Sequence, residues 1–456
     1  MDNMPDLIQV TTVIVAACLL FIVLTARSKR QDVDVLLWWP IVLYIPGPLA
    51  AYFLFSEHPA FADYVDPKSV FVSTIVLVGG FLLYRILLGK RLARQVRFAI
   101  SMLRNSPVIY GATWPLVLLG LACAATQLML IRDTGASLLS SGYVLGEGRF
   151  AENRTLFTMT AGLYECFAAI LALRLVGTKH TVGRDWLFLL YAFGVIALRL
   201  LGGTRLVVLK MLFFIVVVRL LQGRVSKKSA ALFGVGFATL LMIVGSLRGS
   251  EAEDGSNVLF LLFAEPALGN LSATFVTSYY LDRGIFLNPN VVFDSLGYLI
   301  FVIIHLLPNA IYQAFGGDVI YLGDWGYYRS WGAPFYPFRG ILAATGLDTV
   351  SPVGGQSIIA LGVALFGYAG ATFIVPITYG AVSLLHSILT KSMPLILIVG
   401  FEAPSIYREG SEILVKQVFI ISIVFWLFSK LCLIPISRYP CVESQVRPPQ
   451  ASAHNR

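Results

Sequence analysis

The chain has 456 residues, of which 57% are hydrophobic and only 13% are charged. About a quarter of the residues of an average soluble domain are charged, so this composition excludes a domain that folds in water. The formal net charge of +9 is explained by the basic anchoring loops of a membrane protein, and it does not call for nucleic acid as a partner.

Apolar windows of about twenty residues recur along the chain, and each is long enough to cross a hydrocarbon core of about 30 Å. The first window, 7–26, follows an acidic start without the basic flank of a cleaved signal peptide, so we expect it to be retained as a helix. Further helices are predicted near 35–55, 69–89, 107–131, 156–176, 186–202, 205–222, 229–248, 357–387, 392–406 and 413–436. The expected fold is all-α, a polytopic transmembrane helical bundle of about 11–13 spans.

The loops between these helices alternate in charge. Those after the odd-numbered helices are strongly basic, and the positive-inside rule assigns such loops to the cytoplasm. These basic loops cover 26–31, 89–97, 177–184 and 219–228, whereas the mixed or acidic loops cover 56–68, 132–154, 202–205 and 247–256. We therefore expect the N-terminus on the outer side of the membrane and the tail, 437–456, in the cytoplasm.

The residues from Trp186 to Val218 form an almost unbroken apolar run. Two glycines and a threonine interrupt it near its middle, at 202–204. They predict a tight turn at the outer ends of two helices, and Thr204 can cap the second helix. Arg205 is then the first residue of that helix, where the helix dipole disfavours a cation. A cation at this point is better suited to sharing an anionic ligand with the free backbone N–H groups. The alternative is that Arg205 extends to lipid phosphate.

Arginine is the dominant cation on the segments assigned to the outer side, where Lys68 and Lys416 are the main lysines. The planar guanidinium group binds phosphate through two parallel hydrogen bonds, whereas lysine acts as a point charge. The pattern predicts an outward-facing phosphorylated substrate. The arginines concerned are Arg132, Arg149, Arg154, Arg205, Arg248, Arg283, Arg329, Arg339 and Arg408.

The segment 258–312 allows two interpretations. It carries Glu265 beside Pro266, an unusual pair for a lipid-exposed span, and His305 within an apolar run. The segment forms either a transmembrane hairpin or two re-entrant helices on the outer side, and both alternatives return the chain to the same face. We therefore assign 1–312 to transmembrane helices, 313–356 to a large outer loop and 357–436 to the C-terminal transmembrane helices.

The loop 313–356 is the longest hydrophilic connection, and loops of this length are usually functional or disordered. Its high aromatic content argues against disorder. Sugar rings stack on aromatic faces while their hydroxyl groups bond to neighbouring polar side chains. The alternative is an aromatic belt at the membrane interface. The expected sugar-binding residues are Asp324, Trp325, Tyr328, Arg329, Trp331, Tyr336 and Arg339.

The order of these features resembles the O-antigen polymerases, which polymerise the repeat units of bacterial surface polysaccharides. A Gly-Thr-Arg turn at 203–205 is followed by Arg248 at the end of the next outward helix, then by the large outer loop. A small-residue helix at 354–371 follows and ends in Phe-Gly-x-x-Gly. Arg329 and Gly340 match an Arg-x10-Gly spacing of the family. Many members have Asp before the Phe-Gly pair where this chain has Leu365, so no role is transferred there.

The resemblance implies a GT-C-like lipid-sugar glycosyltransferase in the bacterial inner membrane, with its active face in the periplasm. Such a polymerase transfers a growing glycan from undecaprenyl pyrophosphate to the non-reducing sugar of another lipid-linked repeat unit. Its expected partners are the lipid-linked donor and acceptor and the membrane lipid, and a chain-length regulator protein is a further candidate.

Glycosyl transfer from a pyrophosphate requires that the charge of the leaving group be neutralised, which arginines can do without a metal. No paired carboxylate motif on the outer face suggests a divalent cation, so we expect neither a metal nor another cofactor. The expected pyrophosphate-binding residues are Arg205, Arg248 and Arg408. The candidates for the base that deprotonates the acceptor hydroxyl are His305, Glu265 and Asp324.

Two other functions are compatible with the sequence. A glycan ligase of the same superfamily would use the same arginines with lipid A core as the acceptor. A lipid-sugar flippase or other transporter would need internal repeats and ionisable residues near the bilayer midplane. We find no convincing repeat, and Lys210 and Glu265 are the main midspan charges. Loss of long chains with one capped repeat still attached would indicate a polymerase rather than a ligase.

Overall fold

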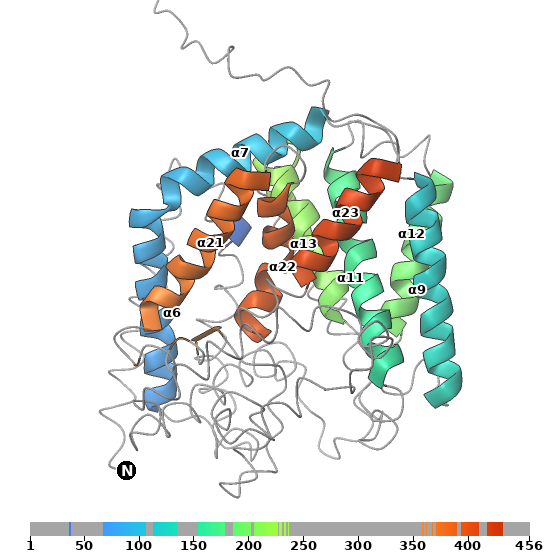
Figure 1. Ribbon diagram of the computed structural model, residues 1–456, viewed down its shortest axis with the longest axis horizontal. Coiled ribbons are helices and arrows are strands. Elements are labelled where there is room, and N and C mark those ends of the chain that lie inside the picture. Colours follow the sequence, from blue (N-terminus) through green and yellow to red (C-terminus); the bar gives the residue numbers. More distant parts are fainter. Residues whose placement is uncertain are drawn as a thin grey trace, which may run out of the picture.

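The structure is a computed structural model. It describes residues 36–37, 67–105, 113–134, 154–177, 186–201, 205–226, 228–229, 232–233, 236, 358–359, 362, 367, 371–389, 394–409 and 417–431. The regular elements among these residues are all helices (Figure 1). Three segments are long and apolar enough to cross a membrane, namely Trp114–Arg132, Met159–Gly177 and Ala371–Leu389. The described part is that of a helical membrane protein, as the composition predicts.

The central helices come from the middle of the chain. They are α9 (Thr113–Thr134), α11 (Arg154–Gly177), α12 (Trp186–Leu201) and α13 (Arg205–Leu221). Helix α11 packs against α9 and α13, and its residues from Tyr164 to Leu173 are almost all buried. This burial explains why α11 has no polar stripe and carries apolar residues all round, apart from the buried Glu165 and Arg174, because a helix surrounded by other helices has no face left for water.

Side-chain contacts fix the directions of these helices. The hydroxyl of Tyr191 in α12 donates to the carbonyl of Val117 in α9 at 2.7 Å, and Arg199 donates to Gln127 at 2.9 Å. Residue numbers rise together in both helices, so α9 and α12 are parallel. Helix α11 is antiparallel to α12, because Arg174 lies over the Phe188 ring while Arg199 lies over the ring of Tyr164.

A second group of helices comes from both ends of the chain. It consists of α6 (Pro67–Leu87), the 3₁₀ turn η3 (Ala371–Phe373), α21 (Ile374–Leu389), α22 (Leu395–Glu409) and α23 (Phe419–Leu431). Helices α6 and α21 lie side by side, with the rings of Tyr84 and Tyr379 in edge-to-face contact at 5.7 Å. Helix α22 contacts α13 and α23 contacts α11, so the two groups share one core.

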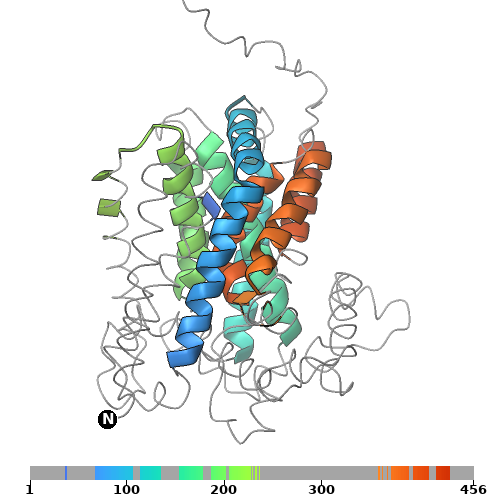
Figure 2. The same ribbon diagram turned by 90° about the vertical axis from the view of Figure 1, so that its left-hand side faces the viewer.

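The basic segment after α6 differs from its prediction as a loop at 89–97. It forms helix α7 (Gly89–Asn105), which follows α6 after a single residue and crosses one end of the bundle (Figures 1 and 2). The physical reason is an apolar stripe at helical spacing, Leu92, Val96, Ala99 and Leu103, all of which are fully buried. The segment was predicted as a loop because positive charge dominates its composition, and the helical spacing of these four apolar residues was not considered.

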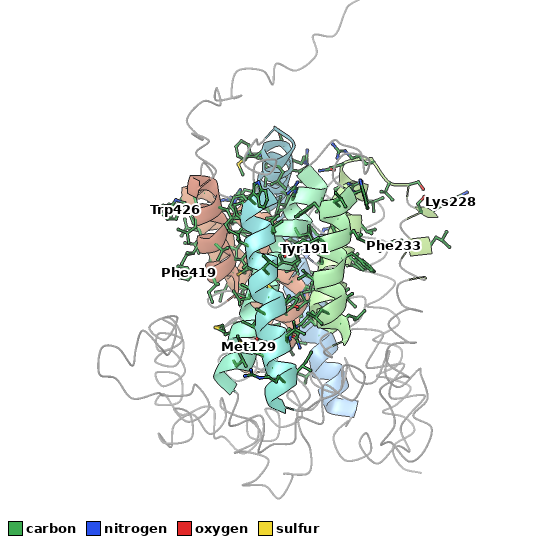
Figure 3. All side chains as sticks on the ribbon, turned by 90° about the vertical axis from the view of Figure 1, so that its right-hand side faces the viewer. Met129, Tyr191, Lys228, Phe233, Phe419 and Trp426 are labelled. Atoms are coloured by element: carbon green, nitrogen blue, oxygen red, sulfur yellow. The ribbon has the colours of Figure 1, made fainter. Side chains whose placement is uncertain are left out.

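Large apolar side chains cover the outward surfaces of several helices. On α9 and α12 they include Trp114, Leu118, Met129 and Phe193, which are between 51% and 76% exposed. Figure 3 shows Met129 on α9, and Phe419 and Trp426 on α23, at the outer surface. Soluble monomers rarely expose contiguous apolar patches of this kind, whereas lipid-facing helices require them. These surfaces agree with a bundle embedded in a membrane.

Several predicted helices are confirmed to within a few residues, namely 69–89, 156–176, 186–202, 205–222 and 392–406. Of the predicted helices 107–131 and 413–436, the structure describes Thr113–Thr134 as α9 and Phe419–Leu431 as α23, and the residues 107–112, 413–416 and 432–436 lie outside the described ranges. Of the predicted helix 357–387, the structure shows the part from Ala371 onward as η3 and α21. Before Ala371, it describes only residues 358–359, 362 and 367. The predicted helices 7–26, 35–55 and 229–248 and the segment 258–312 lie outside the described residues, apart from 36–37, 229, 232–233 and 236.

Candidate functional site

The first feature of the candidate site is the end of the bundle at which Arg205 lies. Arg205 is the first residue of α13, as the Gly-Gly-Thr pattern predicts, and Arg408 lies in the last turn of α22. Lys210 of α13 contacts Glu402 and Ser405 of α22, and Phe214, one turn further along α13, contacts Phe401. Numbers rise in α13 as they fall in α22, so these two helices are antiparallel.

Antiparallel packing brings the backbones of Arg205 and Arg408 to the same end. Arg205 precedes Lys210 by five residues, about 7.5 Å along the axis, and Arg408 follows Ser405 by three residues, about 4.5 Å. The start of α13 and the end of α22 therefore lie within about two helical turns of one shared contact. Two of the three arginines assigned to pyrophosphate are thus near one another along the bundle axis.

Besides Arg199 in the last turn of α12, two further arginines lie at this end. Helix α11 is parallel to α13, because Glu165 contacts Lys210 while Arg219 donates to the carbonyl of Leu175. Its first residue, Arg154, is therefore at the Arg205 end, and so is Arg132 in the last turn of the antiparallel helix α9. We call this end, defined by Arg132, Arg154, Arg205 and Arg408, the arginine end.

The second feature is a buried ionic cluster just inside the arginine end. The Nζ atom of Lys210 lies 2.7 Å from Glu165 Oε2, and it donates to Glu402 Oε2 at 2.8 Å and to Ser405 Oγ at 2.9 Å. The side chains of Lys210 and Glu402 are fully buried, and that of Glu165 is 9% exposed. An ammonium group has three N–H bonds, and three oxygen atoms surround this one. We call these four residues the Lys210 cluster.

The charge of the Lys210 cluster is balanced by a neighbouring arginine. Two carboxylates face one ammonium group, and an uncompensated buried charge is very costly. Arg199 of α12 is 1% exposed, donates to Gln127 Oε1, lies over the ring of Tyr164 and interacts electrostatically with the adjacent Glu165. The cluster and Arg199 thereby connect four helices, α11, α12, α13 and α22, through buried charge.

Sequence reasoning noted Lys210 as a midspan charge without giving it a role, and it missed Glu165 and Glu402. The signal was present, because each glutamate lies within an apolar stretch, "LYECFAA" and "VGFEAPS". An ionisable residue within a membrane segment is by default a candidate for function or for pairing. Which of the charges meet cannot be inferred from a single sequence, since the pairing depends on helix packing.

The other predicted site residues lie outside the described ranges, so the structure does not place them. They are Arg248, Glu265, His305, Asp324, Trp325, Tyr328, Arg329, Trp331, Tyr336 and Arg339. Within the described ranges, no three His, Cys, Asp or Glu side chains gather in a way that could hold a metal ion. The expectation of metal-free chemistry remains a prediction.

Comparison with protein-family models, with curated proteins and with solved structures found no match for this chain.

Proposed function

We propose that this chain is a membrane glycosyltransferase that polymerises oligosaccharide repeat units linked to undecaprenyl pyrophosphate. The observation that carries the proposal is that the backbones of Arg205 and Arg408 lie at the same end of the antiparallel pair α13 and α22. Arginines gathered at one end of the bundle suit a diphosphate that approaches from one side of the membrane. In this proposal the protein lies in a bacterial inner membrane, and its arginine end faces the periplasm.

The remaining architecture follows the same proposal. The bundle is GT-C-like with about 11–13 spans, the N-terminus is periplasmic and the C-terminal tail is cytoplasmic. Helix α7 is basic, and Arg224 and Lys228 lie at the same end of the bundle, opposite the arginine end. By the positive-inside rule these cations support a cytoplasmic location for that end. A chain-length regulator protein is a candidate partner in the same membrane.

The proposed reaction needs charge neutralisation more than covalent catalysis. The acceptor hydroxyl attacks the anomeric carbon of the donor, the bond from that carbon to the pyrophosphate oxygen breaks, and undecaprenyl pyrophosphate leaves. Arg205, Arg248 and Arg408 stabilise the charge that develops on the departing oxygen. The hydroxyl proton passes to His305, Glu265 or Asp324, and the aromatic residues of 313–356 hold the sugars.

Arg205→Lys is the direct test of the pyrophosphate-binding role. Lysine keeps the charge but loses the planar pair of N–H donors, and loss of one stabilising donor typically reduces the rate by about 100-fold. In a deletion strain complemented with this variant, long-chain surface glycan should disappear from gels while single capped repeats remain. Arg224→Lys, exposed at the opposite end, is the matched control and should restore full-length chains. A full-length ladder from Arg205→Lys at normal protein abundance would refute the role, and loss of the single repeats as well would favour a ligase.

A transporter of lipid-linked sugars is the second candidate, and the Lys210 cluster is the observation that favours it. Buried ionisable residues within membrane helices often mark ion or proton pathways. The two hydrogen bonds and the close ion pair of the Lys210 ammonium favour a fixed structural cluster instead. Transport of a lipid-linked repeat unit across vesicles without glycan growth would support the transporter.

A further inference from the structure

Helix α7 carries a dense cationic surface with no function in the proposed polymerisation. Lys90, Arg91, Arg94 and Arg97 are exposed, and α7 contains no acidic residue. Lys90, Arg94 and Arg97 repeat at intervals of four and three residues, so they share one face of the helix. Phe98, 52% exposed, lies beside them. We call Lys90, Arg94, Arg97 and Phe98 the cationic face.

The orientation of α7 is fixed by the face opposite. Its apolar stripe is buried in the bundle, where α7 contacts α6, α11, α21 and α22. Gln95 Nε2 donates to the Ser383 carbonyl at 2.9 Å and to Ser387 Oγ at 3.0 Å, and Arg91 Nη2 donates to Ser387 Oγ at 2.9 Å. The cationic face therefore cannot turn inward without breaking these contacts.

Residues at the end of α6 and at the start of α12 show where α7 lies relative to the apolar outer surface of the bundle. Ile86 and Leu87, the last residues of α6, are 78% and 61% exposed, so α6 remains apolar on its surface up to its end. Helix α7 begins two residues later, after Leu88 (Figure 2). Trp186 is 55% exposed at the start of α12, at the same end of the bundle, and tryptophan is enriched at membrane interfaces. The cationic face thus begins where the apolar surface ends.

We propose that the cationic face of α7 binds the headgroups of anionic phospholipids. Arginine forks match the phosphate group, and basic residues next to a membrane span are attracted to anionic lipid. Charge complementarity selects this occupant, because the face combines several cations and helix α7 itself carries no acidic residue. Phe98 adds an apolar ring that suits the boundary between headgroups and acyl chains. This binding does not depend on the proposed polymerase activity.

The test measures lipid selectivity in the intact protein. Full-length protein is reconstituted in phosphatidylcholine vesicles with trace spin-labelled phosphatidylglycerol or spin-labelled phosphatidylcholine, and electron paramagnetic resonance gives the immobilised fraction of each. We expect the wild-type protein to prefer phosphatidylglycerol and this preference to weaken at high salt. In Lys90→Gln/Arg94→Gln/Arg97→Gln the preference should be lost, since three cations near an anionic surface contribute about fivefold each and about 100-fold together.

The matched control, Arg132→Gln/Arg224→Gln/Lys228→Gln, removes three exposed cations outside α7 and should retain most of the preference. Equal loss in both variants would contradict a site on α7 and indicate a general effect of net charge. A wild-type protein without preference for phosphatidylglycerol would overturn the proposal and point to an acidic protein surface as the complement of α7. Both results are independent of glycan synthesis.

Discussion

Lys210 is a fully buried cation whose ammonium group contacts oxygen atoms from two other helices. Removing one partner of a buried ion pair is far more costly than removing the whole pair, because the remaining charge is left without compensation. The Lys210 cluster therefore contributes to the specific arrangement of α11, α13 and α22 more than to net stability. Through α13 and α22 it also sets the relative height of Arg205 and Arg408.

Lys210→Met should lower the free energy of unfolding by about 3–5 kcal/mol, since the two buried carboxylates then lose the cation that lies between them. The double variant Lys210→Met/Glu402→Gln removes one charge of each sign, leaves Glu165 with Arg199 and should recover most of the loss. Thermal unfolding in detergent, followed by tryptophan fluorescence, provides the comparison. Lys228→Met, at an exposed lysine, is the control and should change stability by less than about 0.5 kcal/mol. Equal stability of Lys210→Met and the wild type would contradict the assignment.

At the scale of the helices, α9 and α12 approach closely because Gly120 has no side chain. A Cβ atom at Gly120 would lie 2.5 Å from Tyr191 Oη and 3.0 Å from a ring carbon of Phe167. Tyr191 also donates to the Val117 carbonyl, so its ring cannot move without losing that hydrogen bond. The glycine thus sets the distance between the two helices.

Gly120→Ala should destabilise the protein by about 1–3 kcal/mol through overpacking. Gly194→Ala is the matched control on α12, because no atom lies within 4 Å of the Cβ that it would introduce. It should leave stability unchanged or raise it by about 0.5–1 kcal/mol, since glycine is unfavourable within helices. The same unfolding measurement distinguishes the two variants, and a stable Gly120→Ala protein would show that α9 and α12 can separate without cost.

The long apolar helices could be predicted from sequence because their length and hydrophobicity are local properties. Helix α7 was missed because the prediction weighed its charges and not the spacing of Leu92, Val96, Ala99 and Leu103. The start of α13 at Arg205 was correct because glycine and threonine mark a helix boundary chemically. The pairing of Lys210 with Glu165 and Glu402 could not be predicted, since it depends on which helices pack together.

At the scale of the whole molecule, the two ends of the bundle differ in their cations. At the arginine end, arginines lie in the first or last turn of α9, α11, α12, α13 and α22. At the other end, the arginines in the last turns of α6, α11 and α13 and those of α7 are joined by Lys90 and Lys228. We assign the arginine end to a diphosphate-linked sugar and helix α7, at the other end, to anionic lipid. The Lys210 cluster lies between them and holds three of the central helices together.

The most direct measurement is polymerisation by the purified full-length protein in liposomes that contain an undecaprenyl-pyrophosphate-linked repeat unit and a chelator of divalent cations. The account predicts a ladder of glycan lengths on gels, with one undecaprenyl pyrophosphate released for each glycosidic bond formed. Arg205→Lys should abolish this ladder and Arg224→Lys should not. Unchanged repeat units, or repeat units that cross the bilayer without growing, would contradict the account.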